Sequence, residues 1–188
     1  VVLLEANRLG WGASGRNGGQ LAYAPRAEMD AHVAALGRED ARRVWQIAAE
    51  ANALVKDLVA RHRIDCDLTP GALELAWKPA HARALEAWAG EAARDWGHPD
   101  IRYVPKADLP ALTGTERYHG GTLDMMAGHL HPLRLALGLA RAASAAGARL
   151  HERSRVTRLA EGRVETEAGR VEAEHVVLAC NGYLDGLV

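Results

Sequence analysis

The chain has 188 residues, of which 48% are apolar and 25% charged, and its formal net charge is -1. This length suits one domain, or one domain with part of a second, and the composition is that of a soluble globular protein. The small net charge argues against a nucleic-acid or anionic-membrane partner. No apolar run reaches the ~18 residues that span a bilayer. Two cysteines, Cys66 and Cys180, are too few for a disulfide framework, so we expect a reducing compartment, the cytoplasm.

The first half of the chain begins with an apolar run and then becomes helical. "VVLL", residues 1–4, is typical of a buried parallel strand. A glycine-rich loop follows, and apolar residues at helical spacing predict helix over residues 28–63, broken near Gly37. Residues 69–77 predict a turn and a strand. Residues 78–97 predict a helix with Pro79 in its first turn and Gly97 near its end.

The second half predicts one long helix between irregular and β segments. Residues 99–117 are punctuated by proline and predict mostly irregular structure, with a short helix over 106–112. Residues 131–150 predict a helix, which we expect to be largely buried because its polar face is small. A short strand, an antiparallel meander over 156–174, a buried parallel strand in "HVVLAC" (175–180) and a loop over 181–188 follow.

Glu5 and the segment "GASGRNGGQ", residues 12–20, are the candidate ligand-binding residues. Glu5 follows four apolar residues, and an acid at the carboxyl end of a parallel strand can accept the ribose hydroxyls of a dinucleotide. Glycines let backbone N–H groups approach a ligand and form an anion-friendly concavity. Two plainer interpretations stay open: Glu5 is where solvent begins, or the loop is a surface connector.

Three motifs in order resemble the flavin-dependent D-amino-acid oxidase superfamily, also called the glycine and sarcosine oxidase group. They are "VVLLEA…GASGRNGGQ", "GGTLDMMAGHLHPLRLALGLARAASAAGARLHE" and "VVLACNGY", and the middle motif is most similar to the gamma-glutamylputrescine oxidase branch. The resemblance implies an α/β fold: a partial FAD/NAD(P)-binding Rossmann-like parallel sheet, an inserted α+β substrate-domain segment and a small antiparallel meander. It assigns residues 1–20 and 130–188 to the FAD-binding domain and 21–129 to the insertion.

The resemblance also implies which residues contact FAD. Glu5 would hold the ribose of the adenosine, and Ser14 and Arg16 would lie near the pyrophosphate and the linker to the flavin. The whole set is Glu5, Ala6, Ser14, Gly15, Arg16, Asn17, Gly18, Gly19, Val156 and Ala179. Cys180 stands where the family usually has Thr, so no role that needs a hydroxyl is expected there. No metal site is expected, because His129 and His131 have no matching third ligand, and catalytic residues are not identified.

Compared with the family, the chain lacks a first strand and its G-x-G-x-x-G turn, because only four residues precede Glu5 and the chain starts at Val1. It also stops before the family's C-terminal part. We therefore expect a piece of a longer protein that by itself does not hold FAD tightly and is inactive. In the family the missing strand lies between residues 1–4 and 176–179, so we expect a gapped sheet or disorder near the N-terminus.

The activity implied by the resemblance is oxidation of a small-molecule amine, such as gamma-glutamylputrescine in putrescine catabolism, with oxygen as acceptor and hydrogen peroxide as product. FAD would carry the chemistry. Two alternatives remain: a nicotinamide-dependent dehydrogenase, since Glu at a strand end also suits NAD, and a non-catalytic remnant of a flavoprotein. Neither the amine nor the oligomeric state follows from the sequence.

Overall fold

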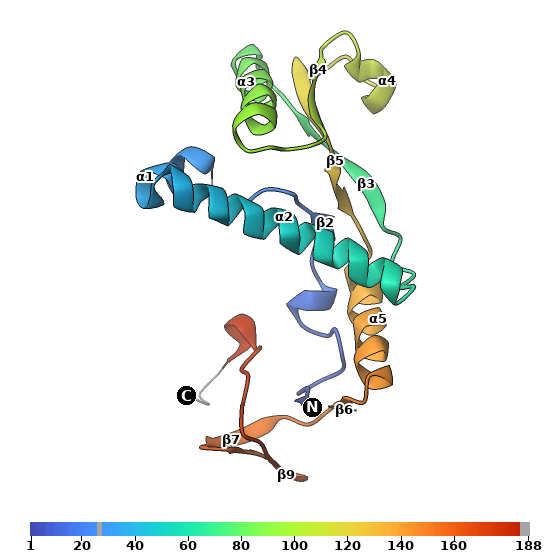
Figure 1. The fold of residues 1–188 in the computed structure, drawn as a ribbon. Helices are drawn as coiled ribbons and strands as arrows, with labels where there is room; N and C mark the ends of the chain where they lie inside the picture. The colour runs from blue at the N-terminus through green and yellow to red at the C-terminus, as the bar shows by residue number, and fades with distance from the viewer. Residues whose placement is uncertain (26–27, 185–188) are drawn as a thin grey trace. The chain divides into compact units, whose positions relative to one another are not determined.

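The computed structural model describes residues 1–25 and 28–184 and divides the chain into two compact units. The first unit comprises Val1–Asn17 and Pro132–Val188, and the second comprises Gly18–His131. Figure 1 shows the elements of both in chain order. The expected division near residues 20 and 130 lies within three residues of these bounds, and the function assigned to each unit stays a prediction.

The first unit holds a parallel strand pair, a helix and a meander. Strand β1 (Val2–Leu4) pairs in parallel with β6 (Arg149–His151), so of the two outcomes expected near the N-terminus, a gapped sheet or disorder, the strand does not show disorder. Helix α5 (Pro132–Ala145) leads into β6, and Gly147 after it has a φ of +90°, which suits a glycine helix cap. Strands β7 (Val156–Ala160), β8 (Arg163–Thr166) and β9 (Gly169–Glu172) form the expected antiparallel meander.

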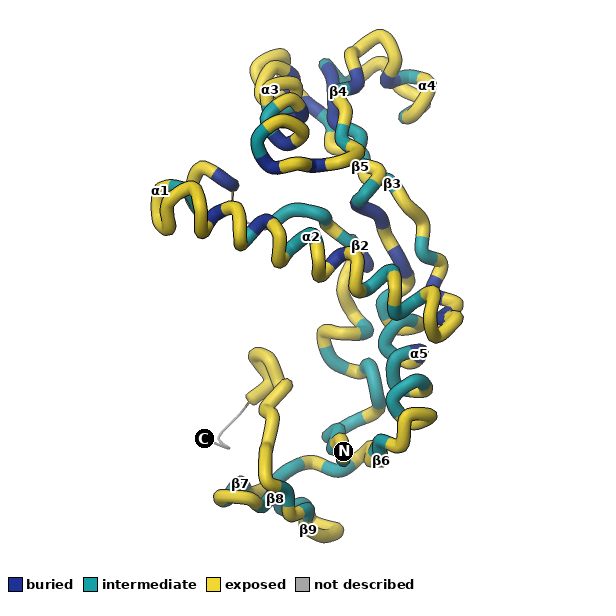
Figure 2. Tube along the Cα trace, in the orientation of Figure 1, coloured by how far each residue is buried: buried dark blue, intermediate teal, exposed yellow. Residues whose placement is uncertain are grey.

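Two expectations about this unit are wrong. Residues 175–180 form no strand and are exposed, with Val177 86% exposed (Figure 2). A strand needs a hydrogen-bonded neighbour, and among the described residues none pairs with this apolar run. Helix α5 is half-buried, with only Gly138 fully buried, because the small two-stranded sheet of this unit leaves much of its apolar surface uncovered. The loop expected over 181–188 contains the turn η2 (Asn181–Tyr183), and residues 185–188 lie outside the described part.

The second unit is a four-stranded antiparallel sheet with helices. Strand β5 (Gly120–His129) is its centre: β3 (Thr69–Leu75) pairs along one edge, while β4 (Ile101–Pro105) and β2 (Gln20–Leu21) share the other. The helices are α1 (Met29–Leu36), α2 (Arg38–Arg61), α3 (Pro79–Asp95) and α4 (Leu109–Thr113). Gly37 separates α1 from α2 with a φ of +80°, as its place in the sequence predicted. Residues 99–117 are less irregular than expected, because they include β4.

The core of the second unit is aromatic. Trp45 of α2 is 3% exposed and packs with Met29, Ala41 and Trp96. Its ring centroid lies 6.1 Å from that of Trp88 on α3, an edge-on arrangement that aromatic pairs prefer.

Cys66 is also buried, and burial raises the pKa of its thiol. No helix in the described part of the chain is long and apolar enough to cross a membrane.

A buried histidine–aspartate pair joins the end of α3 to the central strand. His98 Nε2 lies 3.1 Å from Asp124 Oδ2, and the His98 side chain is 1% exposed. His98 Nδ1 accepts a hydrogen bond of 3.3 Å from the Asp100 backbone N–H, so Nε2 is the ring nitrogen on the side of the carboxylate. Asp124 Oδ1 accepts from the N–H groups of Met126 and Ala127 at 2.8 and 3.0 Å. Asp124 therefore fixes the course of β5 beyond its middle.

Candidate cofactor-binding site

Glu5 lies at the carboxyl end of β1, where the sequence placed it. Its N–H donates to the His151 carbonyl at 2.9 Å, which continues the parallel pairing by one residue. Its carboxylate Oε1 accepts a hydrogen bond of 2.7 Å from the N–H of Asn7. This bond turns the chain after the strand, through Ala6, and holds the half-buried carboxylate at the edge of the sheet. An acid in this position can accept hydroxyl donors of a ribose.

The glycine-rich segment forms a tight turn, η1 (Ala13–Gly15), rather than an open loop. Asn17 closes the turn: its Nδ2 donates to the carbonyls of Ala13 and Ser14 at 3.0 and 3.2 Å. Ser14 and Asn17 are exposed. The Asn17 side chain is thus occupied with shaping the turn, while the Ser14 hydroxyl lies on its exposed surface.

Gly15 is the position at which this turn requires glycine. A Cβ on Gly15 would lie 2.0 Å from the carbonyl oxygen of Gly10 and 3.0 Å from Leu133 of α5. Gly10 has a φ of +74° and a Cβ there would also meet Leu133, at 2.7 Å. The two glycines therefore let the segment pass against itself and against the start of α5.

Arg16 folds back onto the loop. Its Nε donates to the Trp11 carbonyl, and its guanidinium carbon lies 4.7 Å from the centroid of the Trp11 ring, within the range of a cation–π contact. Arg16 is exposed, so the charge stays at the surface of the loop. Its expected place beside a pyrophosphate remains a prediction.

Replacing Arg16 with alanine is expected to loosen the loop by about 1 kcal/mol, because an exposed cation–π contact and a net hydrogen bond are each worth about that much or less. Amide hydrogen exchange over residues 11–17 should become roughly fivefold faster. Arg8→Ala is the control, since Arg8 is an exposed arginine close by in the same segment. Unchanged exchange in Arg16→Ala would show that Arg16 does not hold the loop.

Gly18 and Gly19 belong to the second unit and differ from each other. Gly18 is exposed, and a Cβ there would meet no heavy atom within 4 Å. Gly19 is buried, has a φ of +70°, and its carbonyl accepts from Leu130 N–H at 2.9 Å. The backbone at Gly18 is thus open to a ligand, whereas the glycine at position 19 is required by its positive φ in the fold.

The remaining predicted residues lie in the C-terminal part of the first unit. Val156 opens β7 and pairs with Thr166, and no hydrogen bond between described residues joins it to the glycine loop. Ala179 is exposed, and the turn just after it returns to the loop: the rings of Tyr183 and Trp11 lie 6.3 Å apart. The sequence analysis did not predict the ring contact between Trp11 and Tyr183. An aromatic residue between two glycines, in "GWG", was the available signal for the first.

The whole chain, residues 1–188, matches the model of one protein family, described as FAD dependent oxidoreductase. The chain belongs to this family. It is 36% identical over 190 residues to gamma-glutamylputrescine oxidoreductase of Escherichia coli, covering 98% of this chain and 44% of that protein. It is 34% identical over 191 residues to the probable oxidoreductase OrdL of Rhizobium meliloti, covering 100% of this chain and 45% of that protein. The chain thus spans about half the length of these relatives.

Solved structures show the same fold. Glycine oxidase from Geobacillus kaustophilus superposes with a TM-score of 0.72 at 26% identity, over 95% of this chain and 48% of that one. L-amino acid deaminase from Proteus myxofaciens gives a TM-score of 0.76 at 18% identity, over 95% of this chain and 39% of that one, which supports the fold alone. The α/β fold of an FAD-dependent oxidoreductase is thereby confirmed. FAD, the cofactor expected from the sequence, is that of the family, and the nicotinamide alternative is set aside.

The described residues of this chain fit a dinucleotide. Glu5 offers a carboxylate at the carboxyl end of a parallel strand, as ribose binding requires. The backbone at Gly18 is open to close approach. Which of the ten predicted residues contact FAD remains a prediction.

Proposed function

We propose that the full-length protein carrying this chain is an amine oxidase that uses FAD, with oxygen as acceptor and hydrogen peroxide as product. The observation that carries this proposal is the family match over all 188 residues, together with 36% identity to a gamma-glutamylputrescine oxidoreductase. Gamma-glutamylputrescine is accordingly the first candidate substrate. FAD, when bound, supplies the acceptor for a hydride from the carbon that bears the amine.

This chain's own residues contribute binding and shape to the proposed reaction. Glu5 accepts the ribose hydroxyls of the adenosine, and its hydrogen bond from Asn7 keeps the carboxylate in place. The turn closed by Asn17 presents Ser14 toward solvent on a rigid backbone, where its hydroxyl can donate to a phosphate oxygen. Gly18 allows the chain to approach the flavin side of the cofactor. The two free cysteines support a location in the cytoplasm.

The test is turnover by the full-length protein with FAD bound. Gamma-glutamylputrescine, sarcosine, glycine and a panel of amino acids are supplied in turn, while peroxide is followed in air and flavin absorbance without oxygen. We expect flavin bleaching and peroxide with at least one amine. Bleaching without peroxide would replace oxygen by another acceptor. A protein that holds FAD but is reduced by none of these compounds would contradict the amine-oxidase assignment and favour the non-catalytic remnant.

A further inference from the structure

Two asparagines of this chain are followed directly by glycine: Asn17 precedes Gly18, and Asn181 precedes Gly182. At such a step the backbone nitrogen of the glycine can attack the side-chain amide carbon of the asparagine, because glycine has no Cβ to hinder the approach. The other asparagines precede arginine and alanine, whose side chains hinder it. The sequence makes the two asparagine–glycine steps equivalent, so a difference in their reactivity has to come from the fold.

The side chain of Asn181 lies ready for this attack. The Gly182 N–H donates to Asn181 Oδ1 at 2.8 Å, so the attacking nitrogen already lies against the carboxamide that contains the target carbon. Both residues are exposed, and a Cβ on Gly182 would meet no heavy atom within 4 Å, so the turn η2 has room to rearrange. In the described part of the chain, no hydrogen bond holds Asn181 Nδ2, the nitrogen that would leave.

The side chain of Asn17 is held away from the same reaction. Its Nδ2 donates to the carbonyls of Ala13 and Ser14 at 3.0 and 3.2 Å and so closes the turn η1. This nitrogen would have to leave as ammonia, and the carboxamide would first have to turn toward the Gly18 nitrogen. Breaking two hydrogen bonds before the reaction should make Asn17 roughly tenfold slower than a free asparagine–glycine step.

We propose that Asn181 is a modification site, at which this protein deamidates spontaneously through a cyclic imide. The Gly182 backbone nitrogen loses its proton and bonds to Asn181 Cγ, the Cγ–Nδ2 bond breaks, and Nδ2 leaves as ammonia. Water then opens the imide ring at either of its carbonyls, which gives aspartate or isoaspartate. The net reaction consumes water and releases ammonia, and it needs neither an enzyme nor an oxidant. It does not depend on the amine-oxidase activity.

The modification would act on the contact between η2 and the start of the glycine-rich segment. Tyr183, in the same turn as Asn181, lies with its ring centroid 6.3 Å from that of Trp11, and a Cβ on Gly12 would lie 3.4 Å from the Tyr183 ring. Isoaspartate lengthens the backbone of η2 by a carbon atom, and either product adds a negative charge. We therefore expect the modified turn to lose its fit against Trp11 and Gly12.

The test follows both steps in the full-length protein with FAD bound, kept at mildly alkaline pH, where the attacking nitrogen loses its proton more readily. Digestion after glutamate puts Asn17 and Asn181 on separate peptides. Mass spectrometry measures deamidation of each peptide, and labelling by an isoaspartyl methyltransferase identifies isoaspartate. A sample in guanidinium chloride is the control, because both steps should react at similar rates once the chain is unfolded.

We expect Asn181 to deamidate roughly tenfold faster than Asn17 in the folded protein, and at a similar rate in the unfolded one. Gly182→Ala should slow the reaction at Asn181, because its methyl group hinders the attacking nitrogen, whereas Gly18→Ala is the matched control that leaves Asn181 unchanged. The proposal would be overturned by equal rates at the two asparagines in the folded protein, by a faster Asn17, or by no deamidation of Asn181 while the unfolded chain reacts. A difference that persists in guanidinium chloride, or a reaction unaffected by Gly182→Ala, would also overturn it.

Discussion

Asp124→Ala is expected to destabilise the protein by about 3 kcal/mol, because two hydrogen bonds to a charged acceptor and its buried contact with His98 are lost together. The hydrogen bonds come from the N–H groups of Met126 and Ala127, and His98 Nε2 lies 3.1 Å from Asp124 Oδ2. The His98 ring is buried and would lose its partner, which adds a desolvation cost. Urea unfolding of wild type and variant measures the difference. Glu86→Ala, which removes an exposed carboxylate, should change the free energy of unfolding by less than about 0.5 kcal/mol.

The same pair predicts how stability depends on pH. Burial by itself raises the pKa of the Asp124 carboxyl, but the close contact with His98 and the hydrogen bonds from Ala127 and Met126 outweigh burial and lower the pKa below its usual 3.8. A carboxyl whose pKa is lower in the folded state stabilises the fold above about pH 4, and this stability is lost as pH falls through the folded-state pKa.

Comparison with Asp124→Asn isolates this contribution. The difference in unfolding free energy between wild type and Asp124→Asn should stay constant from pH 7 to 5 and shrink below about pH 4. A difference that does not change down to about pH 2.5 would show that the carboxylate charge is not what holds β5.

Gly15→Ala should have the second largest effect, a loss of about 2 kcal/mol, because overpacking against atoms that cannot move costs roughly 1–3 kcal/mol. The new Cβ would lie 2.0 Å from the carbonyl oxygen of Gly10, which is backbone and cannot rotate away. The turn would have to open, so we also expect the full-length protein to retain less FAD after gel filtration.

Gly18→Ala is the control in the same segment, since a Cβ there meets no heavy atom within 4 Å. It should leave the free energy of unfolding unchanged within about 0.5 kcal/mol. If Gly18→Ala keeps the fold but loses FAD, the open backbone at Gly18 is the contact surface. If Gly15→Ala matches wild type in both stability and FAD content, the packing of the turn does not matter.

The long helices were predictable because their signals are local. Gly37 and Pro79 mark helix ends through backbone preferences that need no tertiary context, and the apolar spacing of α2 follows from helix geometry. Strand β5 was missed because its sequence does not alternate. Its glycines are there for close packing: a Cβ on Gly121 would lie 2.5 Å from the Glu74 carbonyl oxygen, and one on Gly128 2.5 Å from that of Thr69.

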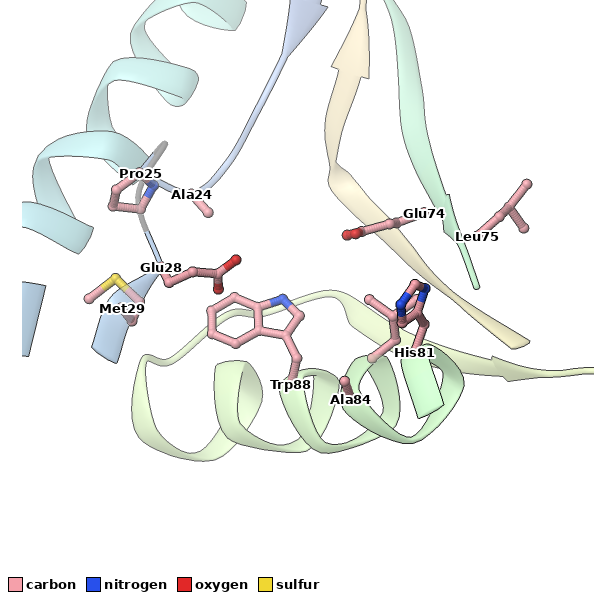
Figure 3. A pocket seen from close by; sticks show the side chains of 10 residues that line it. Ala24, Pro25, Glu28, Met29, Glu74, Leu75, His81, Ala84 and Trp88 are labelled. Carbon is pink, nitrogen blue, oxygen red and sulfur yellow. The ribbon is translucent and has the colours of Figure 1, made fainter. Parts of the chain in front are cut away.

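The apolar run 176–179 shows the opposite limit. Its β-branched residues favour a strand, but a strand forms only with a neighbour, and no local pattern supplies one. In the candidate cofactor site, the strand-end acid and the glycine turn are contiguous and could be predicted. The hollow among α3, β3 and the start of α1 (Figure 3) could not, because its lining residues come from separate stretches of the sequence and are brought together only by packing.

The two ends of the second unit meet in the folded chain. Gln20 pairs with His129, and the Gly19 carbonyl accepts from the Leu130 N–H. The second unit, Gly18–His131, is therefore one continuous segment inserted between Asn17 and Pro132, and its two ends lie side by side. Insertions are tolerated where the two ends of the inserted segment lie close together at the surface. Evolution could exchange this segment for another with equally close ends while leaving the pairing of β1 with β6 untouched.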